Sequence, residues 1–508
     1  MEKDLVLGID SSTTSCKAVV WDRSGNIISS GRSSLEIYNP APGFHEQEAP
    51  SWWKAAVIAI HQACQTINPD RLAGLCISHQ RETFVLVNES GEPIYPAILW
   101  MDERSSSLLP EIKIELKGFD FHSKTGKPLT GNLSFTKLCW LKKHQPQLLA
   151  KAYKILDVQS YLVQKLTGYY RTGWGSADPM GLYDMHSHCW ETNLQKIAGL
   201  CSEQMPEVFP TGSIMGYVTE SAASNTGLPQ GLPVVAGIGD GQAAGIGANI
   251  TSPGNAYLSL GTSVISGTYA PKYQTSNAFR TMYGGIPGSY LFETVLLGGT
   301  YTISWFFDHF LSKPAASTLE EYIPQVESRA AYIPPGSEGL VLVPYWNSAM
   351  NPYWDSSASG IVVGWNGHHS PYHFYRSILE GIALELRLQF QGVEQAIHQP
   401  IQKVIVMGGG AKSDLWCQII ANVTGKPIQR TSTPEAAALG AAIIAAGSVG
   451  VYPNILAASS GMCQFDRQIF SPDENQYEFY SDLFHGVYLH LFPSLQDSLQ
   501  RLSLLARK

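Results

Sequence analysis

The sequence predicts an α/β protein built from two related domains. Apolar segments with strand character alternate with helical segments along most of the chain, which is typical of the α/β class. A strand–turn–strand unit at residues 5–21 is followed, from Asn255, by a similar unit. A chain of 508 residues is also too long for one hydrophobic core. We place the boundary at about residues 246–254, where small residues and a proline gather.

The first domain is expected to begin with three strands in a meander, followed by a mixture of helices and strands. Alternating apolar residues predict the strands, and the turn signal at residues 23–26 separates two of them. The last strong strand of this domain is expected to end at Asp240. The expected strands are 5–9, 16–21, 27–33, 72–78 and 83–88, and the expected helices are 52–67 and 134–143.

The second domain is expected to contain long helices, an alanine-rich helix and a helical tail. Residues 436–465 carry no charge and must be considered as a membrane span. However, the alanine- and glycine-dominated part, 436–447, makes only about three turns, and a span needs about 20 strongly apolar residues. A close-packed buried helix is therefore predicted there. The other expected elements are helices 373–395 and 413–424, a strand 403–407, and a helical tail beyond residue 470.

The composition excludes several classes of function. The net charge of −8 argues against nucleic acid or an anionic membrane as the main partner. The eight cysteines show no CxxC spacing, so neither a zinc knuckle nor a redox pair is indicated. Reduced thiols in a cytoplasmic protein are expected instead. The first residues are not typical of a signal peptide. A homodimer is left open.

Two turns rich in small hydroxylated residues carry the strongest functional signal. The first runs from Asp10 to Lys17, and the second is Gly261-Thr262-Ser263. Such turns can surround a phosphate with backbone N–H groups and hydroxyls. Two of them predict two lobes that bind one polyphosphate, which favours a phosphotransferase. No G-x-x-x-x-G-K-[ST] motif occurs, so a P-loop is not expected. A dinucleotide site at residues 239–244 is disfavoured because no acidic residue follows between 241 and 292.

Two aspartates are candidates for the chemistry. Asp240, between two glycines, is interpreted as an ionised base within reach of an attacking hydroxyl. Its alternative role is to cap the helix that follows it. Asp10 is interpreted as a ligand of Mg²⁺, which takes one or two carboxylates plus phosphate oxygens. The alternative is that it caps its own turn. Lys17 either reaches a phosphate or is a solvated charge of the hairpin.

Two polar segments and a glycine run complete the predicted cleft. The segment His79-Gln-Arg-Glu82 and the segment from Trp100 through Asp102 to Arg104 supply the dense donors and acceptors that sugar hydroxyls need. The alternative for the segment 79–82 is a surface loop, and the alternative for Trp100 is an aromatic residue of the core. Three glycines at 408–410 suggest that a flat group such as adenine lies on bare backbone. A plain strand-to-helix turn, which needs about one glycine, is the alternative.

The chain resembles the FGGY family of carbohydrate kinases over nearly its whole length. The segments Asp10–Lys17, 261–263 and 408–414 are similar to the family's phosphate and adenosine motifs. The segment 132–144 resembles its N-terminal signature, and 360–381 resembles its C-terminal signature, with Trp365 where an aliphatic residue is usual. The resemblance implies two actin-like (ribonuclease H-like) ATPase domains, with ATP and Mg²⁺ in a catalytic cleft between them and Asp240 as the base that deprotonates a sugar hydroxyl.

The resemblance also implies a division of labour between the domains. Residues 1–248 would carry the sugar site, the first phosphate motif and the base, and residues 249–508 the second phosphate motif, the adenosine site and the helical tail. The expected sugar-binding residues are His79, Gln80, Arg81, Glu82, Trp100, Asp102 and Asp240. The expected nucleotide-binding residues are Ser12, Thr13, Thr14, Lys17, Gly261, Thr262, Gly299, Gly409, Gly410, Ala411 and Asp414, and the expected Mg²⁺ ligands are Asp10 and Asp240.

The resemblance favours a ketopentose as substrate, most of all D-xylulose, with D-xylulose 5-phosphate as product. Residues 44–48 and 100–105 are similar to xylulokinases and ribulokinases, whereas Gln80-Arg-Glu-Thr83 is similar to glycerol kinases. Gly241 departs from both groups, and Ser348-Ala-Met350 departs from the Gly-Glu-Arg that is usual in the family. Glycerol, ribulose or another polyol is the alternative substrate. A non-catalytic sugar sensor or an ATP-driven clamp is the alternative of another class.

Overall fold

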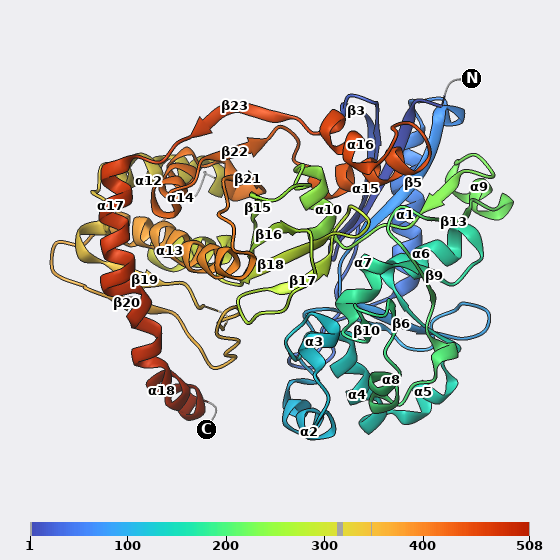
Figure 1. Ribbon diagram of the computed structural model, residues 1–508, viewed down its shortest axis with the longest axis horizontal. Helices are drawn as coiled ribbons and strands as arrows, with labels where there is room; N and C mark the ends of the chain where they lie inside the picture. Colours follow the sequence, from blue (N-terminus) through green and yellow to red (C-terminus); the bar gives the residue numbers. More distant parts are fainter. Residues whose placement is uncertain (1–2, 312–317, 347, 507–508) are drawn as a thin grey trace.

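Two mixed sheets of similar topology, one with six strands and one with seven, form the cores of the two halves of the molecule (Figure 1). The computed structural model describes residues 3–311, 318–346 and 348–506. In each sheet a central strand, β1 or β15, pairs antiparallel with the next strand and parallel with a much later one. This repeated arrangement confirms the α/β class and the internal repeat that the two strand–turn–strand units predicted.

The N-terminal sheet has the strand order β13-β14-β5-β1-β2-β3 and is covered on one face by α1 and α6 (Figure 1). The predicted meander is confirmed, and helix α1 begins earlier than expected because Pro50 fits its first turn. Its elements are β1 (Leu5–Ser11), β2 (Ser15–Trp21), β3 (Ile27–Ser34), α1 (Ala49–Cys64), β5 (Leu72–His79), α6 (Val158–Thr167), β13 (Ile214–Tyr217), α9 (Glu220–Thr226) and β14 (Pro233–Val235).

A smaller helical lobe is inserted between the strands of this half. A four-stranded sheet of order β4-β7-β6-β8 connects it to the main sheet. The sequence predicted helix α4 and, as the strand 83–88, β6, but not the lobe as a whole. Its elements are β4 (Glu46–Gln47), β6 (Phe84–Val87), β7 (Ala97–Ile98), α2 (Leu109–Glu115), α3 (Phe121–Thr125), α4 (Ser134–His144), α5 (Pro146–Lys151), β8 (Lys154–Asp157), β9 (Arg171–Gly173), α7 (Trp174–Ala177), β10 (Tyr183–Asp184), β11 (Cys189–Trp190), α8 (Thr192–Ala198) and β12 (Glu207–Phe209).

The C-terminal sheet has the order β17-β18-β16-β15-β21-β22-β23, and the long helix α13 packs in its core. The expected helices and helical tail are confirmed. The elements are β15 (Asn255–Leu260), β16 (Val264–Ala270), β17 (Arg280–Tyr283), β18 (Tyr290–Leu296), α11 (Thr300–Phe310), α12 (Leu319–Ala330), β19 (Val341–Val343), β20 (Ile361–Val363), α13 (Pro371–Ile397), β21 (Lys403–Met407), α14 (Asp414–Thr424), β22 (Ile428–Thr431), β23 (Phe465–Phe470), α17 (Glu474–Leu483) and α18 (Leu489–Ala506).

Two helices, α10 (Asp240–Gly247) and α15 (Ala436–Ser448), lie against each other between the two sheets (Figure 1). α15, which follows a strand of the C-terminal sheet, packs with α16 (Ile455–Met462) on β1 and β5 of the N-terminal sheet. A Cβ atom at Gly440 would overlap the carbonyl oxygen of Ala243, so small residues permit this close approach. The predicted buried helix is confirmed, and in the described part of the chain no helix is long and apolar enough to span a membrane.

Glu385 of α13 is a fully buried carboxylate that gives stability a pH dependence. The hydroxyls of Tyr345 and Tyr488 donate hydrogen bonds of 3.0 and 2.7 Å to its Oε2. Burial nevertheless raises the pKa of Glu385 to about 7. Because the folded state then binds this proton more tightly than the unfolded chain, stability is greatest below the pKa of the unfolded chain and falls as pH rises to about 7.

The Glu385→Gln variant should lose this pH dependence. From about pH 4.5 to 7 its free energy of unfolding should rise relative to the wild type by up to roughly 3 kcal/mol, since each pKa unit is worth about 1.4 kcal/mol. Thermal unfolding of both proteins across this range measures the difference. Parallel curves of melting temperature against pH would contradict the assignment.

Candidate active site

The first phosphate turn, residues 12–14, joins β1 to β2 and is held by side chains from two other segments. Ser12 Oγ donates to the carbonyl oxygen of Ser15 at 2.8 Å. Trp100 Nε1 donates to Thr13 Oγ1 at 2.9 Å, and Gln47 Nε2 donates to the Thr13 carbonyl at 2.7 Å. The side chain of Thr14 is exposed. The predicted aromatic plate, Trp100, therefore lies directly against the predicted phosphate turn.

The second phosphate turn, residues 261–263, joins β15 to β16 and packs against the start of α11. The amides of Thr300 and Tyr301 donate to the carbonyl oxygens of Gly261 and Thr262 at 2.9 and 3.2 Å. A Cβ atom at Gly299 would lie 2.7 Å from the Gly261 carbonyl oxygen and 2.8 Å from that of Thr262. Gly299 is thus required for this close approach, which orients the turn.

The three glycines at 408–410 differ in what surrounds them. Gly408 has a φ of 87°, and a Cβ at Gly410 would overlap the ring of Trp416, so the fold itself requires both. A Cβ at Gly409 would meet no atom within 4 Å. Nearby, Arg430 holds the end of this segment, since its Nη2 lies 2.6 Å from Asp414 Oδ1 and its Nε donates to the carbonyl of Ala411.

Asp240 is the first residue of α10 and not the end of a strand, because β14 ends at Val235. The helix cap is Gly239, which lies beside His79 at the end of β5. The carboxylate of Asp240 accepts a hydrogen bond of 2.8 Å from the amide of Gly241, and 41% of its side chain is exposed. An accessible carboxylate of this kind can accept a proton from a bound hydroxyl.

Asp10 lies on β1 between Lys17 of β2 and Ser78 of β5. Ser78 Oγ donates to its Oδ1 at 3.2 Å. Burial, and then the negative charge of Asp240, raise the pKa of Asp10 to about 7. The structure therefore brings the two predicted metal ligands close enough to repel each other, an arrangement that a cation would relieve.

Lys17 is held in an ion pair, with 26% of its side chain exposed. Its Nζ binds both carboxylate oxygens of Glu435, at 2.9 and 2.7 Å. Glu435 precedes α15, so this ion pair joins the N-terminal hairpin to the C-terminal half of the chain.

Three of the expected sugar-binding residues are used inside the protein, and we revise the expectation for them. His79 and Gln80 are each 1% exposed. The ring nitrogens of His79 contact the Gln80 carbonyl and Ser176 Oγ, while the Gln80 amide contacts Gln47. Both oxygens of Asp102 are occupied, by Arg104 and by the amide of His45.

Arg104 completes this internal cluster. Its Nη2 lies 2.7 Å from Glu46 Oε1, and its guanidinium lies 4.2 Å from the ring centre of Phe44. The residue types suit a polyol, but here they stabilise the loop that carries Trp100. The side-chain composition of a segment does not tell which way its side chains point, and this is why the sequence misled.

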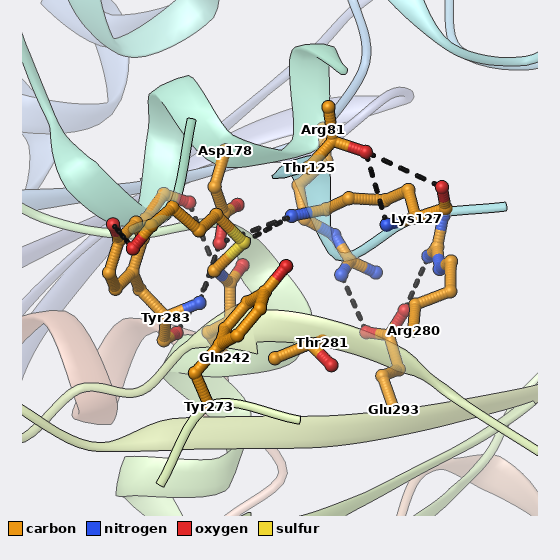
Figure 2. A network of polar contacts seen from close by, with 12 residues as sticks. Arg81, Thr125, Lys127, Asp178, Gln242, Tyr273, Arg280, Thr281, Tyr283 and Glu293 are labelled. Atoms are coloured by element: carbon orange, nitrogen blue, oxygen red, sulfur yellow. Dashed lines mark hydrogen bonds and ion pairs between the residues drawn. The ribbon is translucent and has the colours of Figure 1, made fainter. Parts of the chain in front are cut away.

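Arg81 does lie beside Asp240, and Figure 2 shows Arg81 together with two residues that the sequence did not indicate, Arg280 and Glu293. Arg81 Nε lies 3.1 Å from Asp240 Oδ1. The missed partners are Arg280 on β17 and Glu293 on β18, which bind Glu82 and Arg81. Each is a lone charge in an otherwise uncharged, buried strand, and that signal could have identified them.

Comparisons with known proteins agree with this geometry. The model of the N-terminal domain of the FGGY family of carbohydrate kinases matches residues 5–247, and the model of the C-terminal domain matches residues 256–449. The chain belongs to the FGGY family of carbohydrate kinases. The predicted pair of actin-like α/β domains is thereby confirmed, and an FGGY kinase is expected to use ATP as phosphoryl donor.

Relatives of this FGGY kinase include enzymes named for different acceptors. It is 27% identical to xylulose kinase of Lactococcus lactis subsp. lactis (strain IL1403), over 94% of this chain and 95% of the relative. It is 28% identical to glycerol kinase of Desulforamulus reducens, over 89% of this chain and 91% of the relative. The crystal structure of xylulose kinase from Rhodospirillum rubrum superposes with a TM-score of 0.90 at 26% identity, covering 97% of this chain and 99% of that one.

The glycine run allows a test of where ATP binds to this FGGY kinase. Gly409→Ala adds a methyl group in open space, so the fold should keep its stability. If adenine lies on this backbone, the methyl should cost about 1–3 kcal/mol of ATP binding, or about ten- to a hundredfold in KM for ATP. Steady-state kinetics and thermal unfolding measure the two effects. Gly410→Ala is the matched control, which should lower the melting temperature, and an unchanged KM in Gly409→Ala would contradict the site.

Proposed function

We propose that this FGGY kinase transfers the γ-phosphoryl group of ATP to a hydroxyl of a ketopentose, with D-xylulose as the favoured acceptor and D-xylulose 5-phosphate as product. The observation that carries the proposal is the carboxylate of Asp240, exposed at the start of α10 beside Arg81 and Asp10. Relatives named xylulose kinase, similar over nearly the whole chain, favour the acceptor.

In the proposed reaction Asp240 takes the proton of the attacking hydroxyl. Arg81 lies beside the base, and Trp100 lies beside the first phosphate turn. We assign both residues to the sugar end of the cleft. Residues 12–14 and Gly261-Thr262 would hold the phosphates, and Gly409, Ala411 and Asp414 the adenosine. With this assignment the division into residues 1–248 and 249–508 separates the sugar and base from the adenosine site.

Asp10 and Asp240 fit a Mg²⁺ site by their chemistry. Among the described residues no group of three or more His, Cys, Asp or Glu side chains could hold a metal ion. A pair of carboxylates that leaves other positions to phosphate oxygens and water is what Mg²⁺ prefers. When bound there, Mg²⁺ would neutralise charge on the phosphates. The role of Asp10 would be to hold it, and Ser78 would orient that carboxylate.

A coupled assay of ADP release over a panel of ketoses, polyols and glycerol tests the proposal. We expect the highest kcat/KM with D-xylulose. Preference for glycerol would favour the second candidate, a glycerol kinase, which the segment Gln80-Arg-Glu-Thr83 and the glycerol kinase relatives support. An enzyme that binds sugar without ADP release would contradict both. Cytoplasmic localisation, suggested by eight unpaired cysteines, also belongs to the proposal.

A further inference from the structure

Four charged side chains, two that follow β5 and two from the C-terminal sheet, alternate in sign, and Figure 2 shows three of them, Arg81, Arg280 and Glu293. Arg81 and Glu82 follow β5 of the N-terminal sheet, and Arg280 and Glu293 face each other on β17 and β18. Arg81 Nη1 lies 2.5 Å from Glu293 Oε2, Arg280 Nη1 lies 2.8 Å from Glu82 Oε1, and Arg280 also binds Glu293. We call these four residues the charged quartet. All four side chains are at most 7% exposed.

The charged quartet reaches the base through one guanidinium. Arg81 binds Glu293 with Nη1 and Asp240 with Nε, at 3.1 Å. A guanidinium is planar, so anchoring Nη1 also determines where Nε points. Glu293 therefore decides how Arg81 meets the carboxylate of Asp240. The ion pair between Arg81 and Glu293 joins the two halves of the chain, and so does the ion pair between Glu82 and Arg280. Both ion pairs therefore form only when the halves are together.

Gly241 makes room for this contact. A Cβ atom at position 241 would lie 2.9 Å from Glu293 Oε2, 3.2 Å from Arg81 Nη2 and 3.2 Å from the hydroxyl of Tyr257. Glycine inside a helix is otherwise unfavourable, and Gly241 lies within α10. The position that a side chain at residue 241 would occupy is thus filled by groups of the C-terminal sheet and by Arg81.

We propose that Glu293 is a positioning residue, which holds Arg81 so that Asp240 faces the acceptor hydroxyl when the two sheets are together. This inference rests on the proposed function, in which Asp240 is the base. Glu293 does not touch the acceptor in this role. Its contribution is orientation, and misplacement of a catalytic group by about 1 Å can cost about a hundredfold in rate.

The Glu293→Gln variant tests this role because it removes the charge and keeps the shape. We expect kcat to fall about ten- to a hundredfold while KM for ATP stays unchanged. The matched control is Glu380→Gln, which also removes a buried carboxylate from a buried arginine, Arg376, at 2.8 Å within the C-terminal half. Glu380→Gln should lower the melting temperature and leave kcat unchanged. A Glu293→Gln enzyme that behaves like this control would overturn the proposal.

A second variant keeps the test decisive if Glu293→Gln does not fold. Gly241→Ala retains all four charges but should displace Glu293 from Arg81, so kcat should fall about ten- to a hundredfold while KM for ATP stays unchanged. Full kcat in Gly241→Ala would overturn the positioning role alone. A wild type that phosphorylates no acceptor would overturn the proposed function, and this role with it.

Discussion

Asp240→Asn should reduce turnover by about 10²–10⁴-fold, the range that a general base contributes. Asparagine has nearly the same shape and can still accept the hydrogen bond from Gly241, so folding should be preserved. It cannot take the proton of the attacking hydroxyl. ADP release at saturating sugar and ATP measures the loss, and nucleotide binding by calorimetry should be close to that of the wild type.

A half-buried aspartate elsewhere in the same half is the control for this result. Asp22 accepts hydrogen bonds from the amides of Ser24 and Asn26 in the hairpin turn, and Asp22→Asn should keep full turnover. If Asp240→Asn retained more than about a tenth of the wild-type rate, the expected loss for a base would be absent and another group would have to accept the proton.

Asp10→Asn should raise the Mg²⁺ concentration needed for half-maximal activity by at least about tenfold, the scale of losing an interaction at a metal site. It should also lower turnover. The reason is the proximity of Asp10 and Asp240, whose mutual repulsion favours a shared cation. Mg²⁺ titrations at constant ATP measure the effect. Ser78→Ala, which removes only the hydrogen bond to Asp10, should give a smaller shift, and superimposable titrations of Asp10→Asn and wild type would show that Asp10 only shapes its turn.

The parts of this fold that local signals specify could be predicted from the sequence. The meander of β1 to β3, the two hydroxylated turns and the alanine-rich helix each depend on neighbouring residues, and all are present. The position of Asp240 was misjudged because Gly237 and Gly239 weaken the strand pattern before it, so β14 ends early and a helix begins at the aspartate. The proposed role of Asp240 followed from its neighbours in the sequence and from its carboxylate, whereas its secondary structure was predicted wrongly.

The misjudged part of the site depends on contacts between segments far apart in the chain. Asp102 was expected to face a sugar, but Arg104, two residues away, and His45, in a distant loop, occupy its oxygens. Likewise nothing near Arg81 in the sequence points to Glu293, which lies on another sheet. Residue types gave the chemistry of the cleft, whereas the direction of each side chain depends on packing that no local pattern contains.

The placement of α15 on the N-terminal sheet has a consequence for the order of folding during synthesis. The face of β1 and β5 that α15 covers stays open until residues 436–448 have left the ribosome. At about 5–20 residues per second this delay is on the order of tens of seconds. Throughout it, the apolar side chains of Val6, Val19 and Cys76 lack their final partners. The nascent N-terminal half is therefore a natural client for a chaperone that shields apolar strands until residues 436–448 have been made.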